Sequence, residues 1–192
     1  GTRLDSVPPP APLWAPPAEK RAEWQARLDA LVPAGLRRIA IAWAGRPTHN
    51  NDRNRSITLD VLAPLGALPG VALLAVQKGP AAAQAAEWRG AAPLISLDAE
   101  IADFDDTAAI LAATDLLVCV DTSLGHLAGA LGLPAWVLLP YAPDWRWLMG
   151  RLDTPWYPTL RLWRQPGPRG WAPLIAAVAD ELAASFAYAP MI

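Results

Sequence analysis

Six short apolar segments recur along this chain, and most are separated by stretches that can form a helix. The segments are Arg38–Ala44, Val71–Val76, Pro93–Leu97, Leu116–Val120, Ala135–Leu139 and Leu160–Trp163. Strands that are covered on both faces have continuous apolar runs of this kind. Repeated alternation of strand and helix is typical of a parallel sheet with helices on both faces. We therefore predict an α/β fold with one doubly wound, Rossmann-like parallel sheet of about six strands.

The segments between the strands predict the helices. We expect them over Leu59–Leu68, Ala81–Trp88, Thr107–Ala113, Leu124–Leu131 and Trp171–Phe186, with a short turn over Trp145–Met149. A leading helix should cover Ala18–Leu31, because Trp24, Leu28 and Leu31 recur at helical spacing and Pro33-Ala-Gly35 stops the pattern.

The start of the chain differs from the rest in composition. Prolines gather at positions 8, 9, 10, 12, 16 and 17, which favours an extended stretch. We predict that residues 1–34 form a proline-rich linker with its leading helix, and that residues 35–192 form one Rossmann-like domain. With 192 residues, 53% of them hydrophobic, the chain is long enough for one well-buried domain and short for two.

Charge and composition exclude several classes of protein. The formal net charge is −2 and the basic residues are scattered, so we expect no nucleic-acid partner. No apolar run approaches the roughly 18 residues of a membrane span, and no signal peptide is visible, so we expect a cytoplasmic protein. Cys119, the single cysteine, should pack as a small hydrophobe inside a strand.

The acidic run from Asp98 to Asp106 lacks the spacing of a calcium loop and has no histidine nearby, so we expect neither a metal nor another cofactor. In this run Asp105 or Asp106 is expected to cap a helix that begins at Thr107.

Polar residues follow the predicted strands, where ligands bind in an open parallel sheet. Asp121, Thr122 and Ser123 connect an apolar strand to a helix of small residues and can cap that helix. The free N–H groups and the dipole of such a helix suit a phosphate or pyrophosphate. On spacing alone, an ordinary capped turn is an equal alternative.

Further side chains can reach the same anion. Arg53 and Arg55 supply planar forks to phosphate oxygens, and Lys78 supplies a point charge. His126 lies one turn into the helix, where it either donates to the phosphate or packs in the core. Asp121 should hold the turn or accept from a sugar hydroxyl, because it would repel a phosphate.

The motif Asp121-Thr-Ser-x-x-His126-Leu-Ala-x-Ala-Leu-Gly-x-Pro134 resembles the donor-binding segment of the heptosyltransferase family, glycosyltransferase family 9. It is still more similar to the related domain at the C-terminus of bacterial tetratricopeptide-repeat proteins. Further matches, in the family's order over roughly residues 35–185, are Trp43-Ala-Gly45, His49–Ser56, Gln77-Lys78-Gly79, Asp103–Ala108, Pro143–Trp147 and Asp153–Pro158.

The resemblance implies the C-terminal, donor-binding half of a GT-B glycosyltransferase, which transfers a sugar from a nucleotide diphosphosugar without a metal and with inversion. In that family the acceptor, and usually the catalytic base, belong to an N-terminal domain. We therefore expect these residues alone to be inactive, with that domain and tetratricopeptide repeats as missing partners. The implied substrate-binding residues are Arg53, Arg55, Gln77, Lys78, Asp106, Thr107, Asp121, Thr122, Ser123 and His126.

Two other functions stay open: a nucleotide-sugar epimerase half, and a non-catalytic module that binds a protein. The second alternative rests on the tryptophans, which cluster late at positions 136, 145, 147, 156, 163 and 171. They fit either core packing or an interface. We expect self-association through this tryptophan-rich edge, with Trp145 or Trp156 as the anchor.

Overall fold

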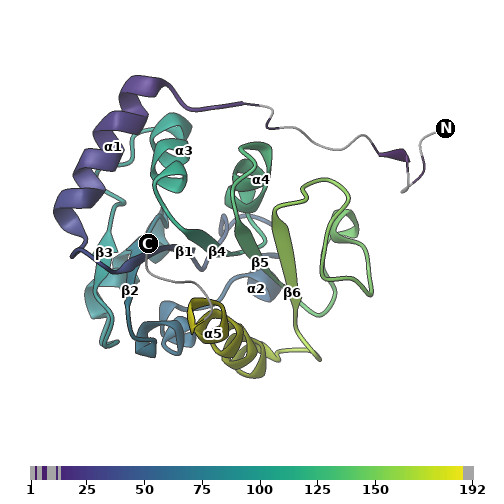
Figure 1. Cartoon of the computed structure of the whole chain (residues 1–192). Helices are drawn as coiled ribbons and strands as arrows, with labels where there is room; N and C mark the ends of the chain where they lie inside the picture. Colours follow the sequence, from purple (N-terminus) through teal and green to yellow (C-terminus); the bar gives the residue numbers. More distant parts are fainter. Residues whose placement is uncertain (1–2, 4–5, 8–11, 13, 188–192) are drawn as a thin grey trace.

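The computed structural model describes residues 3, 6, 7, 12 and 14–187, and these contain one sheet of six parallel strands (Figure 1). Its spatial order is β3-β2-β1-β4-β5-β6. The predicted doubly wound sheet is confirmed. Its strands are β1 (Arg37–Ala42), β2 (Val71–Ala75), β3 (Leu94–Ser96), β4 (Leu116–Val120), β5 (Ala135–Leu139) and β6 (Leu160–Arg164).

Helices cover both faces of the sheet (Figure 1). One face is covered by α1 (Ala18–Leu31), α3 (Phe104–Ala112) and α4 (Ser123–Ala130). The other is covered by α5 (Trp171–Ala187) and by the short turns η2 (Leu59–Leu62), η3 (Leu65–Ala67) and η4 (Pro80–Glu87). Alternate residues of a strand point to opposite faces of the sheet. In β1, Ala40 packs in the core under α1, α3 and α4, and Ile41 packs in the core under α5.

Two predicted helices take a different form. The segment 59–68 is not one helix but the two 3₁₀ turns η2 and η3, separated at Pro64, which has no N–H to continue a helical ladder. The segment 80–87 is also a 3₁₀ helix rather than an α-helix. The connection from β5 to β6 contains, within the described residues, only the three-residue turn η5 (Trp145–Trp147).

The start of α3 was placed wrongly. The helix begins at Phe104, three residues before Thr107, and its cap is Asp103 rather than Asp105 or Asp106. The Asp103 carboxylate accepts from the Asp106 N–H at 2.9 Å, and the Asp106 carboxylate accepts from the Asp103 N–H at 3.4 Å. This reciprocal capping box satisfies donors at both positions and therefore fixes the earlier start.

The leading helix α1 packs onto α3. Its Leu28 is fully buried, and Lys20 and Trp24 both donate to the Asp106 carboxylate, at 2.7 and 3.1 Å. Burial acts to raise the pKa of Asp106, but the hydrogen bonds from Lys20, Trp24 and the Ala102 N–H outweigh it and lower the pKa to about 2. Most of the proline-rich segment lies outside the described residues, so the boundary at residue 34 stays a prediction.

Replacing Asp106 by Asn should lower the free energy of unfolding by about 1–3 kcal/mol, because two donors on α1 lose a charged acceptor. The carboxylate stabilises the fold fully above its ordinary pKa of 3.8, and this contribution is lost as the pH falls toward about 2. Chemical denaturation at neutral and acidic pH measures both effects. The control is Asp105→Asn, in the same helical turn. Equal stability of wild type and Asp106→Asn at neutral pH would contradict the role of this network.

Candidate functional site

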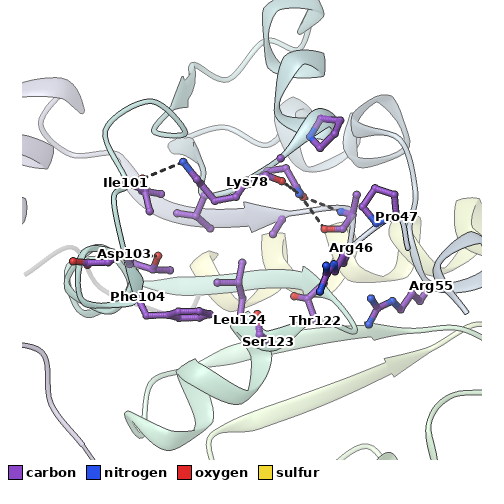
Figure 2. A pocket seen from close by; sticks show the side chains of 18 of the residues that line it. Arg46, Pro47, Arg55, Lys78, Ile101, Asp103, Phe104, Thr122, Ser123 and Leu124 are labelled. Carbon is purple, nitrogen blue, oxygen red and sulfur yellow. Dashed lines mark hydrogen bonds between the residues drawn. The ribbon is translucent and has the colours of Figure 1, made fainter. Parts of the chain in front are cut away.

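A cavity of about 640 Å³ opens at the carboxyl ends of β1, β2 and β4 (Figure 2). This is the sheet edge at which the site was predicted. Six of the ten predicted residues line the cavity: Arg55, Gln77, Lys78, Thr107, Thr122 and Ser123. Arg53, Asp106, Asp121 and His126 do not.

The N-terminus of α4 forms one wall of the cavity. Thr122 is the N-cap residue, but its buried hydroxyl makes no capping hydrogen bond. Ser123 and Leu124 of the first helical turn line the cavity. The first N–H groups of a helix have no acceptor within the helix, so this wall offers donors and the positive end of a dipole.

Arg55 is held in a fixed position beside this wall. Its guanidinium donates to the Asp121 carbonyl oxygen at 2.8 Å, and its Nε lies 3.4 Å from a carboxylate oxygen of Asp52. Gly45 makes room for it, because a Cβ at that position would lie 2.5 Å from the guanidinium. Arg55 is therefore a positioned cation at the rim of the cavity.

Arg46 is a second cation, which the sequence prediction passed over. It is exposed and, like Thr122, lines the cavity (Figure 2). Unlike Arg55, it makes no ion pair or side-chain hydrogen bond within the described part of the chain. Its position directly after Trp43-Ala-Gly45, at the end of the first strand, was the available signal.

Lys78 contributes to the wall but not as a free charge. Its Nζ donates to the carbonyl oxygens of Asp98 at 2.6 Å and Ile101 at 3.0 Å, and it lies 3.2 Å from the Asp98 carboxylate (Figure 2). The ammonium group thus holds the loop after β3 in place, while the rest of the residue lines the cavity.

The Gln77 side chain forms hydrogen bonds that hold the floor of the cavity together. The side chain is buried; its Oε1 accepts from the N–H groups of Trp43 and Ala44 at 3.0 and 2.9 Å, and its Nε2 donates to the carbonyls of Ala44 and Lys78. The three hydrogen bonds to Trp43 and Ala44 join the ends of β1 and β2, so Gln77 positions the backbone around the cavity.

The third side of the cavity is the start of α3. Thr107 is buried, and its hydroxyl donates to the Asp103 carbonyl at 3.1 Å. Phe104, which the sequence prediction did not include, is 58% exposed and also lines the cavity. An exposed ring at this rim is a surface on which a flat ligand group can stack.

The four remaining predicted residues face elsewhere. Asp106 faces α1, and Arg53 lines a second cavity with Tyr141 and Trp171. The Asp121 carboxylate accepts from the Trp147 indole N–H at 2.9 Å and so holds the turn, one of the two roles considered for it.

His126 packs between aromatic side chains. Its ring stacks on Trp147 at 5.0 Å between centroids, and its Nδ1 lies 3.3 Å from the Tyr157 hydroxyl. Burial lowers the pKa of His126, and Arg146 adds to that effect, while Asp121 and Asp144 act against it. In this conformation the side chain packs rather than lining the cavity.

Cys119 is fully buried, as predicted, and burial raises its pKa to about 12. Within the residues that the structure describes, no group of three or more His, Cys, Asp or Glu side chains is arranged to hold a metal ion. The helices of this part of the chain include none long and apolar enough to cross a membrane.

Comparisons with solved structures place the fold. No protein-family model matches the chain. The E. coli ADP-heptose lps heptosyltransferase II is similar, with a TM-score of 0.55 and 16% identity, over 86% of this chain and 53% of that one. E. coli heptosyltransferase WaaC with ADP-2-deoxy-2-fluoro heptose gives a TM-score of 0.57 and 18% identity, over 84% and 47%. The glycosyl transferase family 9 structure from Veillonella parvula DSM 2008 gives 0.60 and 11%, over 88% and 52%.

These likenesses define the fold as that of a GT-B, heptosyltransferase-like domain. The chain spans about half the length of those structures. In sequence it is similar to Protein FlbA of Caulobacter vibrioides, with 28% identity over an alignment of 176 residues that covers 87% of this chain and 28% of FlbA.

The His126 imidazole should titrate below its ordinary pKa of 6.5 in the folded chain. The unfolded chain therefore binds the proton more readily than the folded chain. The stability contributed by the neutral ring is present above pH 6.5, the ordinary pKa, and is lost as the pH falls below 6.5. NMR titration of the ring protons measures the pKa, and denaturation of His126→Gln should show a weaker pH dependence. A pKa of 6.5 or higher would contradict the packed, partly buried environment.

Proposed function

We propose that this chain is the donor-binding half of a glycosyltransferase that uses a nucleotide diphosphosugar. One observation carries the proposal: a single cavity at the carboxyl edge of the sheet combines the N-terminus of α4 with Arg46 and Arg55. Helix N–H groups and guanidinium forks are the donors that bind phosphate oxygens in proteins. The structure of WaaC with an ADP-sugar analogue, a protein of the same fold, supports this choice of ligand.

The contacts of each residue suggest its proposed role in binding the donor. The N–H groups of Ser123 and Leu124 bind the diphosphate, and Arg46 swings onto it because no described group holds its guanidinium. Arg55 is already positioned. These donors stabilise the negative charge that grows on the nucleotide diphosphate as the sugar leaves, without requiring a metal ion. Phe104 offers a stacking surface for the base.

The cavity supplies no obvious base for the acceptor. Asp103 lines it, but its carboxylate accepts from Lys20 and caps α3. We therefore propose that the acceptor site and the base belong to another part of the full-length enzyme, and that this chain alone binds the donor without turnover.

Arg46→Gln should weaken the binding of a nucleotide diphosphosugar roughly 10- to 100-fold, which corresponds to the loss of one charge-assisted hydrogen bond, about 1.5–3 kcal/mol. Calorimetric titration with ADP-, GDP- and UDP-linked sugars and a CMP-linked sugar first identifies the ligand and then measures the variant. Arg21→Gln, an exposed arginine on α1, is the matched control. If no nucleotide sugar binds the wild-type chain, the proposal fails.

A specific observation also keeps the interaction module as a second candidate. Trp147 is buried, but Trp145, Met149 and Leu152 in the same connection are 70%, 68% and 62% exposed. This connection extends from the β6 edge of the sheet (Figure 1). Large apolar patches on a protein surface often mark a site that binds another protein.

If this surface is an interface, the chain should self-associate at high concentration, because two copies can cover it. Sedimentation or light scattering over a concentration series measures the association, and the double variant Trp145→Ser with Met149→Ser should shift it toward the monomer. The solvent-exposed Leu152 can be replaced as a further step. A wild-type chain that stays monomeric at every concentration would leave the self-association prediction unsupported.

A further inference from the structure

A second cavity, of about 540 Å³, lies at the same edge of the sheet and plays no part in the proposed donor site. It is built where β5 and β6 end and α5 begins, and α2 (Asp52–Arg55) borders it. Its lining residues are Arg53, Asn54, Pro140, Tyr141, Ala142, Gln165, Pro168, Arg169 and Trp171.

All of the charged side chains that line this cavity are positive. Its lining includes two guanidinium groups, those of Arg53 and Arg169, and no carboxylate. Neither group forms an ion pair or a side-chain hydrogen bond with any residue that the structure describes. Two uncompensated arginines at one concave site favour an oxyanion, because guanidinium forks match carboxylate and phosphate geometry.

A buried polar group in the wall points to a ligand independently of the charges. Gln165 is 5% exposed, and its Oε1 accepts from the Tyr141 N–H at 3.0 Å. A peptide N–H can only donate, so the side-chain oxygen of Gln165 must face the Tyr141 N–H. The NH₂ group of the same amide therefore points away from the Tyr141 N–H. That NH₂ group has no hydrogen-bond partner among the described residues, although it belongs to a side chain that lines the cavity. A ligand oxygen in the cavity would give this NH₂ group an acceptor that no described residue supplies.

The rest of the wall fits a sugar ring. Tyr141, which is 49% exposed, and Trp171 present aromatic side chains, while Asn54 adds an amide. Sugars combine apolar C–H faces with hydroxyl groups, so aromatic rings and amides together suit them better than they suit a bare ion. Trp171 is also the first residue of the 17-residue helix α5, whose dipole favours negative charge there.

We infer that this second cavity binds an acidic sugar, that is, a sugar ring that carries a carboxylate or a phosphate. Arg53 and Arg169 bind the oxyanion, the Gln165 amide donates to a ligand oxygen, and Tyr141 and Trp171 contact the ring. The site is separate from the donor cavity, because α2 presents Arg53 to this cavity and Arg55 to the other.

The test uses NMR spectra of the whole chain during titration with four probes: glucuronic acid, glucose 6-phosphate, glucose and inorganic phosphate. The signals to follow are the Trp171 indole N–H and the Gln165 side-chain amide. We expect saturable shifts with one or both acidic sugars, and binding at least roughly tenfold weaker with glucose or inorganic phosphate. The two acidic probes distinguish a carboxylate from a phosphate.

Three variants locate the binding. Arg53→Gln and Arg169→Asn should each weaken it roughly tenfold or more; Asn suits position 169 because its φ is +60°. Gln165→Glu keeps the acceptor for Tyr141 but replaces the NH₂ donor with negative charge, so it should abolish binding. Arg21→Gln is the control. The inference is overturned if no acidic sugar shifts these signals, if glucose or inorganic phosphate binds equally well, or if the variants bind like wild type. The Ser123 and Leu124 amides report on the donor cavity separately, so the two proposals can fail independently.

Discussion

The reversal of strand order between β1 and β4 is the constraint on which the rest of the structure depends. From β1 the chain builds outward to β2 and β3, and then returns to add β4 on the other side of β1. The loops that follow β1 and β4 consequently diverge, and a crevice forms where strand order reverses. The cavity that we propose as the donor site lies there, and the parallel pairing of Ile41 with Val118 and Ala42 with Cys119 keeps the two strand ends level.

Side-chain hydrogen bonds then hold the crevice in shape. Gln77 joins the ends of β1 and β2, Lys78 holds the loop after β3, and Arg55 joins α2 to the end of β4. All three were predicted to contact a ligand, which stays a prediction, and all three make hydrogen bonds within the protein. Such contacts reduce the conformational freedom that a ligand would have to remove, so they can aid binding without touching the ligand.

The strands and the position of the cavity could be predicted because their causes are local in the sequence. Apolar runs such as Leu116–Val120 identify buried strands, and the carboxyl-edge rule then selects the loops. The orientations of single side chains could not be predicted, because they depend on distant partners. Lys78 binds near residue 98, His126 packs against Tyr157, and Asp106 accepts from Lys20, 86 positions away. A charge pattern does not reveal which of these partners the fold brings close.

The four-residue helix α2 links the two cavities physically. Arg53 and Arg55 are two positions apart, and residues at that spacing on a helix do not face the same way. Arg55 is tied to Asp52 and to the Asp121 carbonyl, while Arg53 has no such contact in the described chain. Any ligand that pulls Arg53 would therefore act on a segment that is anchored, through Arg55, to the N-terminal end of α4. A coupling between the two sites, if both are occupied, would have to pass through this short helix, so its size depends on how rigidly Asp52 and the Asp121 carbonyl hold Arg55.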